Sequence, residues 1–170
     1  MTDQASELLQ RARAERTAYD HEHEQPIVGY GAVLASFGCA MGLAAGIAKL
    51  AGKKLPVAVR VTDLIVGGVA VHKAGRLIAL DAVTSPLRAP FNRFKGPTGG
   101  AEVAEEVRAE GPWHAVGEMV SCPFRLGPWL SAAYTTGLVV APRLARTVAG
   151  GFAVVGISDW LQQGYEKLKS

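Results

Sequence analysis

The chain has 170 residues, a formal net charge of +3 and 20 glycines, and charged residues make up 19% of it. That length favours one compact unit, and the charged fraction lies below the roughly 25% of soluble domains. The basic residues are scattered with few aromatics between them, which argues against a nucleic-acid partner. Two cysteines are too few for a disulfide framework or a four-ligand zinc site. The composition therefore favours a membrane protein.

Residues 1–25 are polar and mostly helix-forming, and they predict an N-terminal tail or helix ahead of one helical membrane domain over 26–170. His21 and His23 in this tail are two positions apart, whereas ligands on one helix face are three or four apart. A solvated linker is therefore favoured over a metal site. No metal site and no cofactor is predicted elsewhere in the sequence.

Apolar stretches predict an all-α integral membrane protein of about four helices. No charged residue occurs from Gln25 to Ala48, and such a run is long enough to cross a hydrocarbon core of about 30 Å. It resembles a retained anchor more than a signal peptide, because no small-residue cleavage site follows it. The expected helices cover approximately 27–50, 61–80, 114–141 with a break near 122–128, and 144–168.

Three glycines in the first apolar stretch, Gly38, Gly42 and Gly46, recur every fourth residue and share one helix face. Small residues at this spacing are typical of helix-packing contacts in lipid. The stripe predicts close packing, either on another helix of this chain, which we favour, or on a second subunit.

The segment after Val71 is the most polar part of the apolar region. Thr84-Ser85-Pro86 is typical of a helix start, and it predicts a short interfacial helix near 85–95. A mobile, solvated loop is expected over 96–111, which is rich in Gly and Glu. The candidate binding residues of this segment are His72, Lys73, Arg76, Asp81, Thr84, Ser85 and Arg88.

Two interpretations of this cluster remain open. Hydroxyls beside arginines suit a phosphate or a lipid headgroup. The simpler interpretation is that the side chains satisfy one another, with Arg76 or Arg88 paired with Asp81 and Thr84 acting as a helix cap. Three further charges in apolar segments, Glu118, Arg125 and Asp159, are expected inside the bundle, with Glu118 facing Arg125 and Asp159 facing His72 or Arg76.

Three runs of the sequence resemble one known family. They are V-A-V-H-K-A-G-R-L over 69–77, D-A-V-T-S-P-L-R-A-P-F over 81–91, and G-E-M-V-S-C-P-F over 117–124. The family is an uncharacterised group of small bacterial membrane proteins that includes the sporulation-associated YjcA-like proteins. The resemblance covers roughly residues 28–165 and implies a helical membrane protein without a known activity.

One position departs from the family pattern. Members typically carry C-P-F-C-x-G-x-W, and Arg125 stands where they have the second cysteine, three residues after Cys122. A single thiolate forms no C-x-x-C redox pair, and zinc would need three other ligands.

We expect a small multi-pass membrane protein that acts as an accessory or scaffolding subunit and docks a partner protein or lipid headgroups. The alternative is a small transporter or membrane enzyme that acts on an anionic or lipid-like substrate. No catalytic motif is found, so no catalytic residue is predicted. Expected partners are membrane lipids and a protein partner or a second copy of the chain. The distribution of Lys and Arg between loops predicts the bacterial cytoplasmic membrane, with both termini in the cytoplasm.

Overall fold

The structure is a computed structural model that describes residues 6–8, 10, 11, 14, 27–56 and 58–169. Most of the expected tail over 1–25, including His21 and His23, lies outside these described residues. The elements in chain order are α2 (Ile27–Leu50), α3 (Val61–Leu80), the 3-10 turn η1 (Ala82–Thr84), α4 (Ser85–Arg88), β1 (Asn92–Gly99), β2 (Glu102–Val107), α5 (Pro112–Val120), α6 (Pro123–Val140) and α7 (Pro142–Lys169).

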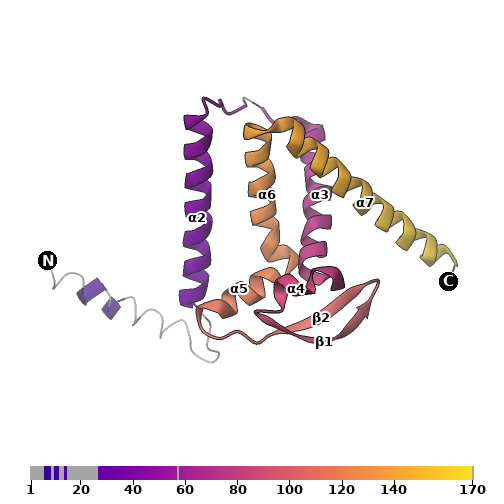
Figure 1. Cartoon of the computed structure of the whole chain (residues 1–170), viewed down its shortest axis with the longest axis horizontal. Coiled ribbons are helices and arrows are strands. Elements are labelled where there is room, and N and C mark those ends of the chain that lie inside the picture. Colours follow the sequence, from indigo (N-terminus) through magenta and orange to yellow (C-terminus); the bar gives the residue numbers. More distant parts are fainter. Residues whose placement is uncertain (1–5, 9, 12–13, 15–26, 57, 170) are drawn as a thin grey trace.

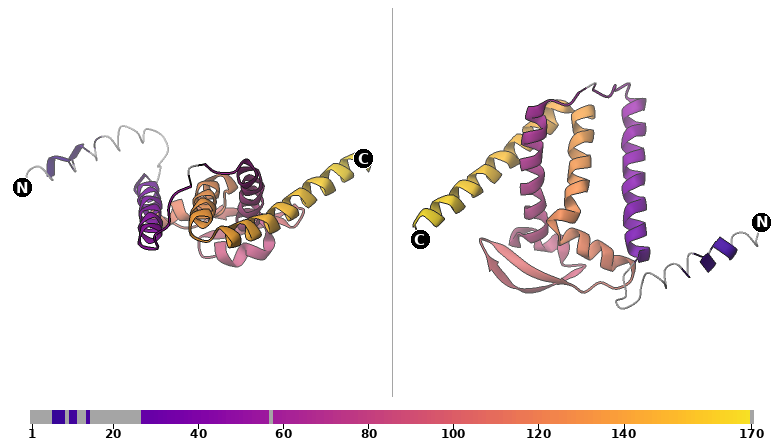
Figure 2. Two further views of the ribbon diagram at one scale, coloured as in Figure 1. Left: turned by 90° about the horizontal axis from the view of Figure 1, so that it is seen from above. Right: turned by 180° about the vertical axis from the view of Figure 1, so that it is seen from behind.

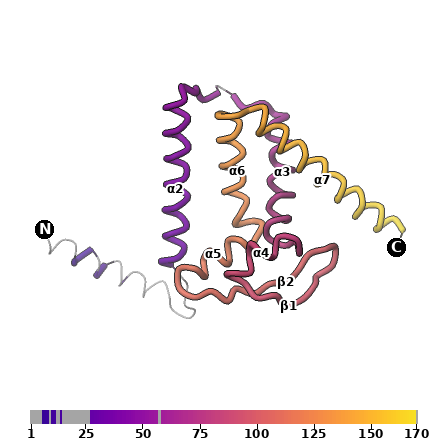
Figure 3. The backbone as a smooth tube through the Cα atoms, viewed as in Figure 1, coloured from indigo at the N-terminus to yellow at the C-terminus, as the bar shows by residue number. Residues whose placement is uncertain are grey.

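Helices α2, α6 and α3 stand side by side in an upright row, and α5, α4 and the strands lie across one end of it (Figure 1). Helix α7 crosses α3 and then slants away from the row, so that the C-terminus projects from the body (Figure 2). The path of the chain in Figure 3 places the connection between α2 and α3 at the opposite end from the strands.

Small residues allow α3 to pack closely on both α6 and α7. A Cβ added at Gly67 would lie 2.2 Å from Cε1 of Tyr134, and one at Gly156 would lie 3.1 Å from Cγ1 of Val69. These backbones approach so closely because glycine has no side chain. The buried apolar residues of α3 and α7 are correspondingly small: Ala70, Ala74, Ala79, Ala149 and Ala153.

A bidentate ion pair fixes the beginning of α3 to α7. Arg146 donates to the two carboxylate oxygens of Asp63 at 2.9 and 2.8 Å, and these hydrogen bonds hold the pKa of Asp63 below its ordinary value. The hydroxyl of Tyr134 in α6 donates to the backbone carbonyl of Asp63 at 2.9 Å. One residue of α3 therefore joins three helices.

Helix α2 is attached to the body over a small area. A Cβ at Gly29 would lie 2.9 Å from the Cβ of Ala115 in α5, and the Phe37 ring meets Trp129 of α6 edge to face at 5.1 Å. The long apolar stretch of α2 is otherwise not buried against the rest of the structure. Among the described residues, α2 is the one helix long and apolar enough to cross a membrane, a property that membrane anchors and N-terminal signal sequences share.

The glycine stripe of α2 faces open space. Nothing in the described chain lies within 4 Å of a Cβ built at Gly38, Gly42 or Gly46. The structure therefore places no helix of this chain against the stripe, contrary to the packing that the sequence favours.

The segment expected as an interfacial helix and a mobile loop is instead a β-hairpin. Helix α4 ends at Arg88, and β1 pairs with β2 antiparallel from Asn92↔Val107 to Gly99↔Glu102. The two turn residues, Gly100 and Ala101, have φ angles of 57° and 67°, as the tight turns that match the twist of a hairpin require.

The fold class expected from the sequence is therefore wrong. The chain is mostly helical but contains a two-stranded antiparallel sheet, and within the residues that the structure describes one helix rather than four meets the length and hydropathy of a membrane span. The break expected near 122–128 lies at Ser121 and Cys122, and Pro128 is accommodated inside α6.

Candidate functional site

The structure divides the predicted polar cluster into two separate sites. Thr84, Ser85 and Arg88 lie inside the fold, between the end of α3 and the hairpin. Lys73, Arg76 and Asp81 line a cleft between α3, α7 and the hairpin turn. The two groups differ in burial and in what they contact, so each is described separately.

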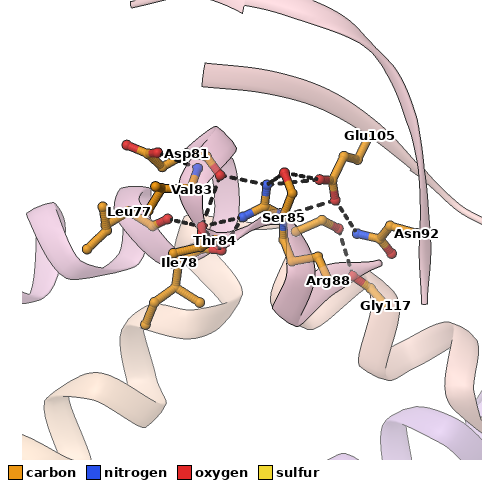
Figure 4. Close-up of polar contacts among 11 residues, drawn as sticks. Leu77, Ile78, Asp81, Val83, Thr84, Ser85, Arg88, Asn92, Glu105 and Gly117 are labelled. Atoms are coloured by element: carbon orange, nitrogen blue, oxygen red, sulfur yellow. Dashed lines mark hydrogen bonds and ion pairs between the residues drawn. The ribbon is translucent and has the colours of Figure 1, made fainter. Parts of the chain in front are cut away.

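Arg88 is the most deeply buried side chain of the first group, with 0% of its surface exposed. Its Nε and Nη2 donate to the two carboxylate oxygens of Glu105 in β2, each at 2.9 Å. Nη1 donates to the Ile78 carbonyl at 2.6 Å and to the Thr84 hydroxyl at 2.7 Å. Nη2 also reaches the carbonyl of Asp81 at 2.9 Å, so every nitrogen of the guanidinium has an acceptor (Figure 4).

The hydroxyls of the first group also have partners within the fold. Thr84 Oγ1 donates to the Leu77 carbonyl at 2.6 Å, which closes the end of α3. Ser85 Oγ lies 3.3 Å from Glu105 Oε1 and 3.2 Å from Arg88 Nη2. These groups satisfy one another, but the carboxylate that pairs with Arg88 is Glu105 and not Asp81, and the Thr84 hydroxyl bonds the end of α3 instead of capping the start of α4.

Glu105 is ionised in this setting although its side chain is only 6% exposed. Burial alone would raise the pKa of its carboxyl, but hydrogen bonds from Arg88, Asn92 and Ser85 outweigh burial and lower the pKa below its ordinary value. Asn92 Nδ2 donates to Glu105 at 3.1 Å, while its Oδ1 is buried without a partner among the described residues. The arrangement is a structural clasp that joins α3, α4 and the hairpin, and we call it the Arg88 clasp.

The second site is a cleft of about 440 Å³, which we call the polar cleft. Two ion pairs cross it: Lys73 Nζ lies 2.5 Å from Asp159 of α7, and Arg76 Nη2 lies 2.5 Å from Glu102 of β2. Asp81 Oδ1 accepts the backbone N–H of Val83 at 2.9 Å and so starts the 3-10 turn.

His72 differs from both groups because it lies against an aromatic ring. Its imidazole is 5.8 Å from the Trp160 ring, between centroids, and is tilted by 48°. Asp159, expected to face His72 or Arg76, instead pairs with Lys73. The sequence therefore identifies the charged faces of α3 and α7, but it does not identify which residues pair.

Glu118 and Arg125 form a pair, at 2.5 Å, in a third polar group where α2, α5 and α6 meet. Glu118 also accepts a hydrogen bond from Tyr30 of α2, and His114 Nε2 lies 3.7 Å from it. Burial alone would raise the pKa of Glu118, but the hydrogen bonds from Tyr30 and Arg125 lower it below its ordinary value. Because Tyr30 belongs to α2, its bond to Glu118 holds α2 to the body. Arg125 is 46% exposed, so the pair lies at the surface of the protein.

Sequence reasoning missed the residues that the hairpin contributes. Glu102, Glu105 and Asn92 all lie in a segment expected to be a helix end or a mobile loop. The available signal is Gly99-Gly100 between two runs that contain β-branched or aromatic residues, which is typical of a hairpin turn.

The described residues hold no group of three or more His, Cys, Asp or Glu side chains placed to bind a metal. Cys39 lies exposed on α2, and Cys122 caps the start of α6. Neither position brings a nucleophile together with a base. The arrangement of the described residues is therefore suited to holding elements together and to binding, through the polar cleft.

Comparison with known proteins confirms the resemblance drawn from the sequence. A family model described as a protein of unknown function, DUF1360, matches residues 66–165, more than half of the chain. The sporulation protein YjcA of Bacillus subtilis is 25% identical over 111 residues, which cover 59% of this chain and 94% of YjcA. No solved structure matches the chain. The family match spans most of α3, the Arg88 clasp, most of α7 and the lining of the polar cleft apart from Glu166 and Lys167, and the chain belongs to the DUF1360 family.

Proposed function

We propose that the protein is a membrane-anchored accessory protein of the bacterial cytoplasmic membrane, in which α2 is the anchor and the remaining elements dock a partner protein. The observation that carries the proposal is the exposure of α2. Leu34 and Leu43, near its middle, are 72% and 68% exposed. Burying such side chains in lipid is worth about 1.5–3 kcal/mol each relative to leaving them in water.

An accessory role has more support than the alternative of a transporter or membrane enzyme for an anionic or lipid-like substrate. Arg88 is the strongest candidate for an anion-binding residue, and its guanidinium is already saturated by Glu105 and by carbonyl groups. Lys73 and Arg76 are held by carboxylates as well. An anionic substrate would have to break these pairs before it could bind.

The open surfaces of the helices are suited to the proposed partners, which are lipids and a protein partner or a second copy of the chain. Besides α2, apolar side chains are exposed along the second half of α7, among them Ile157, Leu161 and Leu168. The expectation that both termini lie in the cytoplasm requires an even number of spans. A single span by α2 would place residues before Ile27 and after Leu50 on opposite sides of the membrane.

The anchor is tested by extracting bacterial membranes with alkaline carbonate. We expect the wild-type chain to stay in the membrane pellet, and the variant with both Leu34→Arg and Leu43→Arg to be released. Each arginine at the centre of a membrane helix costs about 2.5–3.5 kcal/mol on insertion. The matched variant with Leu34→Ala and Leu43→Ala should stay in the pellet. Release of the wild-type chain would contradict the proposal.

The accessory role is tested separately by extracting the protein in a mild detergent and measuring the mass of the particle. We expect a second polypeptide or a second copy of the chain in the particle. A particle that contains one chain alone would rule the accessory role out.

A further inference from the structure

We propose that the polar cleft receives a basic side chain, Lys or Arg, presented on a short extended segment of the docked partner protein. The inference rests on the proposed function, since it names the chemistry by which the partner is recognised. It concerns Asp81, which the sequence already offers as a candidate binding residue, and Glu166 and Trp160, to which nothing above assigns a binding role.

The cleft exists because α7 crosses α3 and then diverges from it. At the crossing, a Cβ on Gly156 would lie 3.1 Å from Val69 Cγ1 and 3.3 Å from Lys73 Cβ. Beyond this point the second half of α7 slants away from α3 (Figure 1), and Gly100 and Glu102 of the hairpin line the space between them. Three separate elements thus provide walls, and the volume of about 440 Å³ lies within the range of small-ligand sites.

The side chains that line the cleft carry more negative than positive charge. Lys73 and Arg76 are each held by one carboxylate at 2.5 Å, from Asp159 and Glu102. Two more carboxylates, Asp81 and Glu166, line the same space, against one more cation, Lys167. The lining therefore has three cations and four carboxylates, and a ligand with one positive charge would balance it.

Asp81 and Glu166 are the carboxylates available to such a ligand. Asp81 uses Oδ1 to accept one backbone N–H. Glu166 is exposed and has no ion-pair partner within the described part of the chain. A charge-assisted hydrogen bond from an ammonium or guanidinium to either carboxylate disrupts no existing ion pair, whereas an anion at Lys73 or Arg76 would have to displace Asp159 or Glu102.

An aromatic ring adjoins the cleft and favours the same class of ligand. Trp160 and His72 line an adjacent space of about 120 Å³ that shares Lys73, Arg76 and Asp159 with the main cleft. The indole is 49% exposed, so part of its ring remains available. A cation placed over an indole face is attracted by the ring by about 0.5–2 kcal/mol.

The remaining lining distinguishes a polypeptide from a free cation. Gln162 and Gln163 line the cleft beside the carboxylates. Primary amides donate and accept hydrogen bonds, which matches the alternating N–H and C=O groups of an extended backbone. A metal ion or a simple polyamine could use the carboxylates and the amide oxygens, but it has no carbonyl group to accept from the amide N–H donors.

The test follows the indole N–H signal of Trp160 by NMR in detergent-solubilised full-length protein. The probe is a capped five-residue peptide of alanines with one central arginine, at millimolar concentration. We expect a saturable shift of the Trp160 signal, identified by its loss in Trp160→Phe. Trp113 and Trp129 lie outside the cleft, so their signals should not move.

Matched variants and probes make the outcome specific. The double variant Asp81→Asn with Glu166→Gln should weaken peptide binding about tenfold or more, because it removes the charge from two acceptors. Glu106→Gln, on the exposed face of β2, should leave binding unchanged. Undisturbed Trp113 and Trp129 signals in the double variant show that it is folded.

Three results would overturn the inference: no shift with the arginine peptide, equal or tighter binding of the matching glutamate peptide, or equal binding of spermidine. The last result would assign the cleft to free polycations. Such failures leave the carbonate extraction and the particle mass unaffected, so they refute the ligand of the cleft without refuting the anchored accessory role.

Discussion

At the scale of single residues, the Arg88 clasp shows that Thr84, Ser85 and Arg88 already have partners within the fold. Arg88 is completely buried, and Glu105 is 6% exposed. A buried charge is tolerated when it is paired and its remaining donors are satisfied, and both conditions hold here. The clasp joins the end of α3 to a hairpin that has little apolar core of its own.

Replacing Arg88 by methionine tests this role. Loss of one partner leaves the Glu105 charge buried and uncompensated, so we expect the free energy of unfolding to fall by about 3–5 kcal/mol. Urea unfolding in detergent, followed by circular dichroism, measures the change. The double variant Arg88→Met with Glu105→Met should recover part of the loss. Lys95→Met breaks the ion pair with Glu106, in which the two side chains are 53% and 61% exposed. This change should have no measurable effect on stability. Wild-type stability in Arg88→Met would refute the clasp.

The lowered pKa of Glu105 predicts how the contribution of the clasp varies with pH. An unperturbed glutamate titrates near pH 4.3, and the folded-state pKa is lower. The stabilisation is therefore fully present above about pH 4.3 and is lost as the pH falls through the folded-state pKa. The stability difference between the wild type and Glu105→Gln should be large at pH 7 and shrink below about pH 4. A difference that stays constant from pH 7 to pH 3 would contradict an ionised Glu105.

At the scale of elements, the hairpin positions both sites. Its inner residues Asn92 and Glu105 complete the clasp, while Glu102, beside the turn, reaches Arg76 at the cleft. The Ala82 N–H donates to the Ala101 carbonyl at 2.9 Å and fastens the turn to the end of α3. The segment is thus a β-hairpin that lines the polar cleft.

The backbone conformation of Ala101 in the turn is unfavourable, and a substitution can relieve this cost. Ala101 is the one non-glycine residue with a positive φ in the described part of the chain, and the left-handed region costs such a residue about 1–2 kcal/mol. Ala101→Gly should therefore raise the free energy of unfolding by about 0.5–1 kcal/mol, measured as above. Ala104→Gly, in the regular part of β2, should lower it by a similar amount. Equal effects at the two positions would contradict the turn geometry.

The sequence predicts the helices better than it predicts what joins them. Long apolar stretches predict helices at 27–50 and 61–80, where the structure has α2 and α3. The hairpin is hidden because its strands contain Gly96, Pro97 and three glutamates, which have low strand propensity. Pairing of Glu105 with Arg88 stabilises the hairpin through a contact between segments 17 residues apart, and such contacts leave no local pattern.

The same limit applies to membrane insertion. Apolar content alone suggests four spans, but α3 contains Asp63, Lys73 and Arg76, whose ion pairs connect it to α7 and the hairpin. These partners become visible only in three dimensions. Helix α2 has no charged residue before Lys49 and is hardly buried. Among the described helices, it alone keeps the length and hydropathy of a membrane span.

At the scale of the whole molecule, the described part of the protein consists of an exposed apolar helix attached through its first half to a body with a polar cleft. The attachment of α2 relies on Gly29, on the Phe37–Trp129 contact and on the Tyr30–Glu118–Arg125 group. The body carries the family match and both polar sites. An anchored docking protein requires this division into a helix and a body. The central claim of the proposed function is that α2 inserts into the membrane.

The most direct test of that claim is the reactivity of Cys39, which lies near the middle of α2 and is exposed in the isolated chain. In a Cys122→Ser background, Cys39 should resist a membrane-impermeant maleimide on intact cells and on inverted vesicles, and react fully after denaturation in SDS. A reporter cysteine at Lys54→Cys, in the connection after α2, should react from one side of the membrane. Labelling of Cys39 in intact membranes at the rate of that reporter, or recovery of the chain in the soluble fraction, would contradict the account.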